Sequence, residues 1–349
     1  MNSKEIIQRV LAFDKPERIG LTYSPYENGP RICDTAGVGP SPDPDFEARH
    51  WEDDAGGECY NDEWGCLWRR IKGKTTGGEV IEPPIKSWED LASYRLPTYD
   101  DPSRYEKAAE YCAKTTDRYI LGSIAGACFN AARYLRKLEA YLLDCAAEPE
   151  NVRRLNTMVS DLILRQVDIY ADIGAHGVFF CEDWGTQERL LVSPRMWDDL
   201  FRETFQRLID RAHSRGLTVW MHSCGYVRDI IPHLVDMGMD VLQFDQPELH
   251  GLEWLAQFSG RVTYWCPVDI QRILPTGDEE LIKSRARDMV RILNGTQTEV
   301  LAASLKSMDE VIATLLAGAQ HITLPLDLIL ALGDHPFTQQ AIEEFDAAG

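Results

Sequence analysis

The chain has 349 residues, and Asp and Glu outnumber Lys and Arg by 56 to 36, which gives a formal net charge of −20 at pH 7. A negative charge of this size argues against nucleic acid or an anionic membrane as the main partner. No apolar run approaches the ~18 residues that span a bilayer, and charges interrupt the apolar positions of the N-terminal segment, unlike a signal peptide. We therefore expect a cytoplasmic protein without a membrane or nucleic-acid partner.

The first 20 residues have the pattern of an amphipathic helix, and residues 21–100 are rich in Gly, Pro, Asp and aromatic residues. That composition predicts long loops with short strands, and its aromatic residues indicate a folded layer and not a linker. From about residue 105, short apolar runs alternate with amphipathic segments. The expected strands are 19–23, 119–123, 177–181, 218–222, 241–244, 262–266, 300–303 and 322–325. The expected helices include 194–215, 227–237, 278–293 and 308–317.

Alternation of strands and helices at this spacing predicts parallel strands joined by helical crossovers. Eight such strands favour a closed (β/α)8 TIM barrel over an open sheet, and the chain length suits one such barrel with insertions. No glycine-rich nucleotide-binding loop opens any of the helices. We therefore predict an α/β protein whose residues 1–349 form a single TIM-barrel domain with an N-terminal loop-rich extension.

The sharpest chemical feature is His222-x-Cys224, which follows one expected strand. Side chains two apart on a strand point the same way, so the imidazole and the thiol are expected to converge. Such a pair suits a soft metal, above all Zn²⁺, which needs at least one further ligand. Cys266 at another strand end is the first choice, followed by Glu182 and Asp183. The alternative is a hydrogen-bonded core histidine beside a small buried cysteine.

Other polar side chains also follow expected strands, where the functional groups of a barrel gather. Glu182 and Asp183 are candidates for catalytic acid and base, or one of them caps a helix while the other is solvated. The candidates for contacting a substrate are Trp184, Gln187, Gln246 and Asp269. For Trp184, a role as a loop anchor is the alternative.

From the N-terminus to about residue 295, the chain resembles the uroporphyrinogen decarboxylase superfamily in its cobalamin-dependent methyltransferase branch. The resemblance is carried by NDEWGCLW, EDWGTQERLLVSPRMW, the HSCG that contains His222 and Cys224, and CPVDIQRILPTGDEE. It implies a TIM barrel in which zinc, bound by His-x-Cys and a later Cys, activates a methyl acceptor. The methyl group would come from a corrinoid protein, so cobalamin would be carried by that partner.

The sequence departs from this pattern at both ends. The arginine-rich N-terminal signature of the decarboxylases is missing, and no cysteine follows Cys266. Residues 296–349 instead resemble the closing segment of transaldolase and fructose-6-phosphate aldolase, through LAAS, AGAQHITLPLD and HPFT. Aldolase chemistry does not come with this segment, because no lysine ends a middle strand to form a Schiff base.

Three hypotheses follow from the sequence. The first is a methyltransferase-like enzyme that moves a methyl group to or from a corrinoid protein, with zinc activating a small-molecule acceptor or donor. The second is a metal-free decarboxylase or lyase that uses carboxylates at the barrel mouth. The third is a hybrid barrel without activity.

Overall fold

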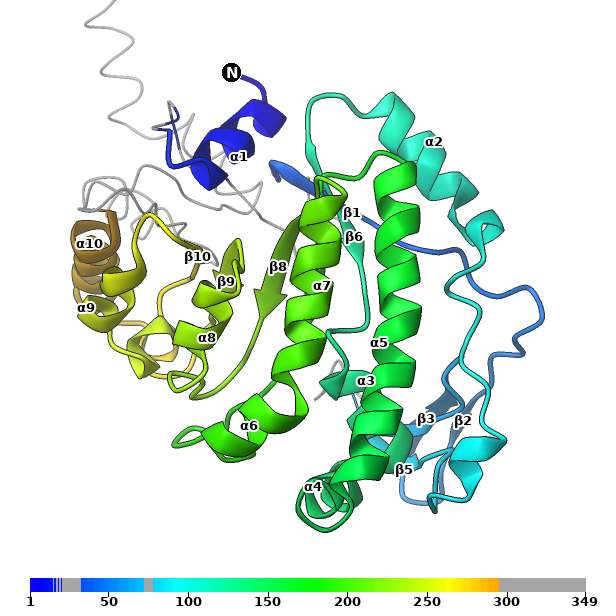
Figure 1. Ribbon diagram of the computed structural model, residues 1–349. Helices are drawn as coiled ribbons and strands as arrows, with labels where there is room; N and C mark the ends of the chain where they lie inside the picture. The colour runs from blue at the N-terminus through cyan, green and yellow to red at the C-terminus, as the bar shows by residue number, and fades with distance from the viewer. Residues whose placement is uncertain (15, 17, 19, 21–32, 72–77, 295–349) are drawn as a thin grey trace, which may run out of the picture. The chain divides into compact units, whose positions relative to one another are not determined.

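The computed structural model describes residues 1–294 except 15, 17, 19, 21–32 and 72–77 (Figure 1). The chain divides into two compact units. Among the described residues, one unit comprises 37–115 and 120–239, and the other comprises 1–36, 116–119 and 240–294. That residues 1–349 form a single TIM-barrel domain stays a prediction from the sequence.

A parallel sheet forms the centre of the larger unit. Strands β6 (Tyr119–Ser123), β7 (Gly177–Cys181) and β8 (Thr218–His222) lie side by side in parallel. These bounds equal the three predicted strands, because short apolar runs between polar turns are typical of buried parallel strands. The side chains of Val178 and Val219 are completely buried, as the core of such a sheet requires.

Helices precede, connect and follow these strands. They are η1 (Asp90–Ala92), η2 (Pro102–Tyr105), α2 (Glu106–Lys114), α3 (Phe129–Arg136), α4 (Leu138–Ala147), α5 (Pro149–Asp172), α6 (Pro194–Leu200), α7 (Arg202–Ser214) and α8 (Ile231–Asp236). Of these, α2, α3, α5 and α7 carry an apolar stripe. The predicted helix 194–215 is two helices, α6 and α7. The break falls at Phe201, whose φ of −128° is not helical and whose buried ring packs 4.7 Å from the ring of Trp184.

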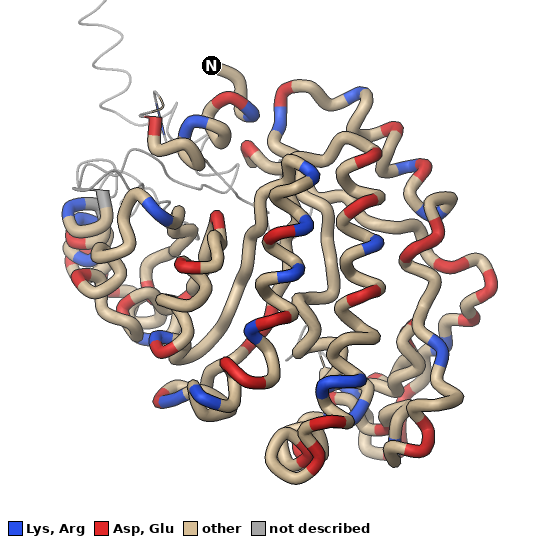
Figure 2. The backbone as a smooth tube through the Cα atoms, in the orientation of Figure 1, with Lys and Arg blue, Asp and Glu red and all other residues tan. Residues whose placement is uncertain are grey.

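Helices α5 and α7 pack against each other, and acidic and basic residues occur along both (Figure 2). The resulting ladder pairs Arg207 of α7 with Asp161 of α5 at 2.5 Å, and Arg211 with Asp168 at 2.7 Å. These pairs are partly exposed, so each contributes little to stability. They do favour one alignment of the two helices.

The segment before residue 100 contains a second, antiparallel sheet, which the sequence predicted only as short strands. It consists of β2 (His50–Glu52), β3 (Gly57–Asn61), β4 (Leu67–Ile71) and β5 (Glu79–Glu82), while β1 (Thr35–Val38) lies outside it. Across one face, His50, Tyr60 and Trp68 stack in a row, and Tyr134 of α3 meets the edge of the row. Cross-strand aromatic pairs of this kind stabilise a sheet, which confirms the expected folded layer.

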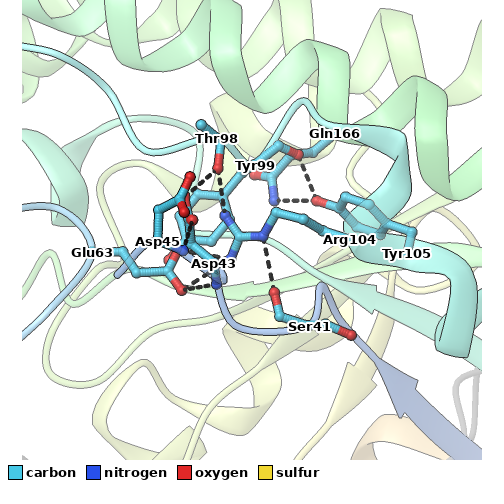
Figure 3. A network of polar contacts seen from close by, with 9 residues as sticks. All are labelled: Ser41, Asp43, Asp45, Glu63, Thr98, Tyr99, Arg104, Tyr105 and Gln166. Atoms are coloured by element: carbon cyan, nitrogen blue, oxygen red, sulfur yellow. Dashed lines mark hydrogen bonds and ion pairs between the residues drawn. The ribbon is translucent and has the colours of Figure 1, made fainter. Parts of the chain in front are cut away.

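The turn between β3 and β4 is held by a buried arginine (Figure 3). Arg104 donates to both carboxylate oxygens of Glu63, at 2.9 and 2.7 Å, and to the backbone carbonyl of Ser41 at 2.9 Å. A further bond runs to the hydroxyl of Thr98, and the arginine side chain is 3% exposed. A buried bidentate pair whose arginine also binds Ser41 and Thr98 fixes several loops at once.

The other unit contains α1 (Ser3–Leu11), β9 (Val241–Gln243), η3 (Pro247–Leu249), α9 (Leu252–Leu255), η4 (Ala256–Phe258), β10 (Thr263–Trp265), η5 (Leu274–Thr276) and α10 (Glu279–Asn294). Strands β9 and β10 pair in parallel, inside the predicted 241–244 and 262–266. Helix α1 begins with a capping box, in which Asn2 accepts from the Glu5 amide and the Glu5 carboxylate accepts from the Asn2 amide.

Several predictions fall outside the described residues. They are the strands 300–303 and 322–325, the helix 308–317, most of strand 19–23, and the whole segment 296–349. What the described part shows is an α/β arrangement with parallel strands. Among the described residues, no helix is both long enough and apolar enough to cross a membrane.

Candidate metal centre

The candidate site lies where β7 and β8 end. Cys181 and His222, the last residues of the two strands, are partners in the parallel register. The chain beyond them stays paired, because the Glu182 amide donates to the His222 carbonyl at 2.9 Å and the Tyr226 amide donates to the Thr186 carbonyl at 2.7 Å. The two loops therefore run together past the end of the sheet.

Two glycines allow this close approach. A Cβ added at Gly225 would lie 2.2 Å from the carbonyl oxygen of Gly185, and a Cβ at Gly185 would lie 2.5 Å from the amide nitrogen of Tyr226. Gly225 also has a φ of +77°, a conformation that side chains with a Cβ rarely adopt. These contacts give a physical reason for the glycines that end HSCG and begin GTQ.

The paired loops bring together three potential ligands. The Nε2 atom of His222 lies 3.2 Å from the Sγ atom of Cys224 and 3.6 Å from the Oδ1 atom of Asp183. That same carboxylate oxygen accepts a hydrogen bond of 2.9 Å from the Cys224 amide. One ligand atom from each of the three side chains fits within 4.8 Å of the others. The convergence predicted from the two-residue spacing of His222 and Cys224 is what the structure has.

This donor set fits a zinc ion. A tetrahedral Zn²⁺ with bonds of about 2.0–2.3 Å separates its ligand atoms by about 3.3–3.8 Å, close to the spacings found here. An imidazole nitrogen, a sulfur and a carboxylate oxygen are all ordinary zinc ligands, and three protein ligands leave a position open, as in catalytic sites. The His222 side chain is 14% exposed and that of Asp183 is 42% exposed, so an ion could reach the cluster.

Glu182 points elsewhere, although it is the neighbour of Asp183. It is completely buried, and its Oε1 accepts from the Cys128 amide at 2.9 Å, just before α3 begins. Its Oε2 accepts from the indole of Trp184 at 3.2 Å. Burial raises the pKa of this carboxyl to about 7, against the hydrogen bonds that lower it. In this geometry Glu182 serves the N-terminus of α3, and its catalytic role stays a prediction.

The two neighbouring candidates differ in exposure. Trp184 is fully buried, with its ring stacked 3.9 Å from that of Phe129 and its amide donating to the Ser223 hydroxyl. It anchors the loop, which was the alternative reading of this residue. Gln187 is exposed beyond the paired segment.

The remaining candidates belong to the other unit. Cys266 follows β10 and is 1% exposed, and burial raises the pKa of its thiol to about 12. Asp269 is equally buried, and its Oδ1 accepts from the amides of Gln271 and Arg272. Gln246 is 5% exposed. Their membership of the site is a prediction that the structure leaves untested.

Comparison with solved structures supports the fold. A methyltransferase from Methanosarcina mazei is similar with a TM-score of 0.53 and 16% sequence identity, over 73% of this chain and 75% of that one. Identity this low speaks for the fold alone.

Short matches to curated proteins are of a different kind. A probable transaldolase from Geobacillus thermodenitrificans is 38% identical over 53 residues, which is 15% of this chain and 25% of that protein. One from Herpetosiphon aurantiacus is 41% identical over 61 residues, 17% of this chain and 28% of that protein. The chain thus spans about a quarter of the length of these relatives, so the transaldolase likeness is partial.

A family model covers much more of the sequence. The model described as uroporphyrinogen decarboxylase (URO-D) matches residues 69–304, which is more than half of the chain and includes β7, β8 and the three clustered side chains. The chain belongs to the uroporphyrinogen decarboxylase family.

Proposed function

We propose that this protein is a methyltransferase-like enzyme with a zinc ion held by Asp183, His222 and Cys224. The observation that carries the proposal is the convergence of an imidazole nitrogen, a sulfur and a carboxylate oxygen at the ends of two paired strands. The proposed reaction moves a methyl group between a corrinoid protein and a small-molecule thiol or methyl donor. In the same proposal, the parallel strands belong to a closed eight-stranded barrel.

The chain's own residues have defined tasks in this proposal. Asp183 holds the Cys224 amide at 2.9 Å, which fixes the backbone that carries the sulfur. Gly185 and Gly225 keep the two loops in contact, so the three ligands hold their spacing before an ion binds. A preformed site of this kind loses little entropy when it is filled.

A bound Zn²⁺ would supply Lewis acidity, which lowers the pKa of a thiol that occupies the open position. The exposed side of the cluster, formed by Cys224 and Asp183, is where an acceptor would enter. Gln187, which is exposed, keeps the substrate contact predicted for it, while Glu182 fixes the loop through the Cys128 amide and the Trp184 indole. Cobalamin would remain on the partner protein.

Metal analysis of protein purified without chelators tests the proposal. We expect about one zinc per chain, and loss of that zinc in His222→Ala and in Cys224→Ser. Cys181→Ser is the matched control, because Cys181 is also an exposed cysteine at a strand end but lies outside the cluster. Protein without zinc, or zinc that survives both ligand substitutions, would refute the metal site.

The third ligand is decided in the same experiment. Asp183→Asn is expected to release zinc, whereas release from Cys266→Ser and not from Asp183→Asn would assign the position to Cys266. Transfer is measured as loss of the methylcobalamin absorption spectrum in the presence of 2-mercaptoethanol. Carbon dioxide release from polycarboxylates, without transfer, would favour a lyase instead.

A further inference from the structure

A cavity of about 310 Å³ lies beside the ends of β6 and β7. Its walls come from the β3–β4 turn, from β4, from α3 and from β7, all of which belong to the same unit. The lining includes the aromatic rings of Trp64, Trp68, Tyr134 and Phe179. A cavity with several aromatic walls and few polar groups selects a ligand with a large apolar surface.

Two of the rings form a corner. The rings of Trp68 and Tyr134 are inclined at 68°, with their centroids 4.6 Å apart. Trp68 is held in place, because its indole donates to the Asp62 carboxylate at 2.6 Å and its ring stacks on Tyr60. Both residues line the same cavity, and aromatic rings on the wall of a cavity attract a cation that lies over their faces.

Among the described residues that line the cavity, the charge has one sign, because Asp62 contributes a carboxylate and none of the others is Lys or Arg. Asp62 accepts from the Cys66 amide at 2.8 Å and from Trp68, both neutral donors. Burial raises the pKa of this carboxyl, since an uncompensated charge there is costly. Arg133 is not part of the lining, although its guanidinium carbon lies 4.8 Å from the centroid of the Tyr134 ring.

We propose that this cavity binds a methylated ammonium cation, with its methyl groups against Trp64, Trp68 and Tyr134 and its charge balanced by Asp62. A quaternary ammonium has no N–H group that apolar walls would leave without an acceptor, so it enters at a lower cost than a primary amine. The aromatic faces then attract its charge.

The cavity adjoins the candidate metal centre. Cys181 lines the cavity and is the register partner of His222 on the neighbouring strand. A ligand in this cavity lies beside the end of β7, one strand away from His222. Its use as a methyl donor rests on the proposed function, whereas its binding does not.

The test is a calorimetric titration of the full chain, freed of metal, with choline and with 3,3-dimethyl-1-butanol. The second compound has the same shape without the charge. We expect choline to bind about tenfold more tightly, the scale of a desolvated cation–π contact. Equal binding of the two compounds, or no binding of choline, would overturn the proposal.

Two substitutions of Tyr134 distinguish a contribution of its aromatic ring to binding from a general effect on folding. Tyr134→Phe keeps the ring and is expected to keep choline affinity, whereas Tyr134→Leu is expected to lose about tenfold. Both variants remove the hydroxyl that accepts from Arg133, so that bond cancels in the comparison. An equal loss of choline affinity in the two variants would contradict a role of the Tyr134 ring in binding the cation. Trp51→Leu is the control, because Trp51 is exposed and lies outside the lining.

The charge has its own variant. Asp62→Asn is expected to weaken choline binding and leave binding of the neutral isostere unchanged, and an unchanged preference for choline would contradict the role of Asp62. Because these titrations use metal-free protein, choline binding without zinc binding would reject the methyltransferase and keep the cavity. Zinc binding without choline binding would reject the ammonium site in the cavity and leave the proposed metal centre intact.

Discussion

The Arg104 cluster and the ends of β7 and β8 both gather charged side chains, but they use them in opposite ways. Around Arg104, the guanidinium is 3% exposed and its donors are taken up by Glu63, Ser41 and Thr98. At the strand ends, the polar atoms of Asp183, His222 and Cys224 face one another, and two of the three side chains stay substantially exposed.

The difference separates stabilising polar networks from binding sites. A buried charge that is fully paired contributes to a unique structure and has no capacity left for a ligand. Three ligand atoms that lie within 4.8 Å of one another can instead be bridged by one cation. The contrast can be tested by removing one member from each group.

The largest effect is expected for Arg104→Ala. Loss of the guanidinium leaves the Glu63 carboxylate, which is 14% exposed, without its counter-charge. Breaking a buried pair from one side costs about 3–5 kcal/mol, so the free energy of unfolding should fall by that amount in a urea titration. A loss under about 1 kcal/mol would show that the cluster is not a closed network.

Arg153→Ala is the matched control for this substitution. Arg153 also pairs with two carboxylates, those of Glu150 and Asp199, but these are 83% and 61% exposed. Pairs of that kind contribute less than about 1 kcal/mol. The comparison holds if the two arginine variants differ by more than the uncertainty of the titration.

The open cluster should instead gain stability from a ligand. With free zinc at 100 times its dissociation constant, the free energy of unfolding should rise by about 2.7 kcal/mol. His222→Ala should show little of this gain, while Arg153→Ala should show all of it. An equal gain in wild type and His222→Ala would place the bound zinc elsewhere.

Much of the fold could be predicted because β6, β7 and β8 are short apolar runs between polar turns. The antiparallel sheet β2–β5 could not be located in the same way. Its strands are short. All three residues of β2 are exposed and no residue of β4 is buried, so neither strand shows an alternation of buried and exposed positions. That sheet is stabilised by contacts between distant residues, such as Trp68 with Tyr134 and Arg104 with Glu63, which no local pattern records.

The site was predictable in part for a similar reason. Spacing alone brings His222 and Cys224 to one side of β8. Alignment of the two predicted strands at their last residues, Cys181 and His222, places Asp183 opposite Cys224, and this register could have promoted Asp183 above Cys266 as the third ligand. The burial of Glu182 depends on α3, which begins more than 50 residues earlier, so neighbouring sequence gave no sign of it.

Glu182 extends the comparison, because its carboxylate is buried and hydrogen-bonded while the side chain of the adjacent Asp183 is 42% exposed. Its pKa in the folded protein is raised to about 7 from an ordinary 4.5 by burial. The folded state therefore holds a proton that the unfolded state releases. This contribution to stability is complete below pH ~4.5 and is lost as the pH rises through about 7, which amounts to about 2–3 kcal/mol between pH 5 and pH 8.

Chemical denaturation of metal-free protein between pH 5 and pH 8 measures this loss. Glu182→Gln should flatten the pH dependence, because the amide does not titrate. Asp62 and Glu248, whose pKa values are also raised by burial, contribute equally to both proteins and cancel in the difference. The same slope in both proteins would show that Glu182 stays charged in the folded state.

The smallest effect is expected on the ladder between α5 and α7, which resembles neither region. Each of its arginines is paired with a carboxylate, as in the Arg104 cluster, but the pairs are partly exposed, as at the strand ends. The side chain of Arg207 is 34% exposed and that of Asp161 is 46% exposed. Asp161→Asn keeps the shape of the side chain and removes its charge, and we expect a loss of about 0.5 kcal/mol. Salt at 1 M shortens the screening length to about 3 Å, so the difference from wild type should disappear there. A loss that persists in high salt would mean that geometry, and not charge, aligns the two helices.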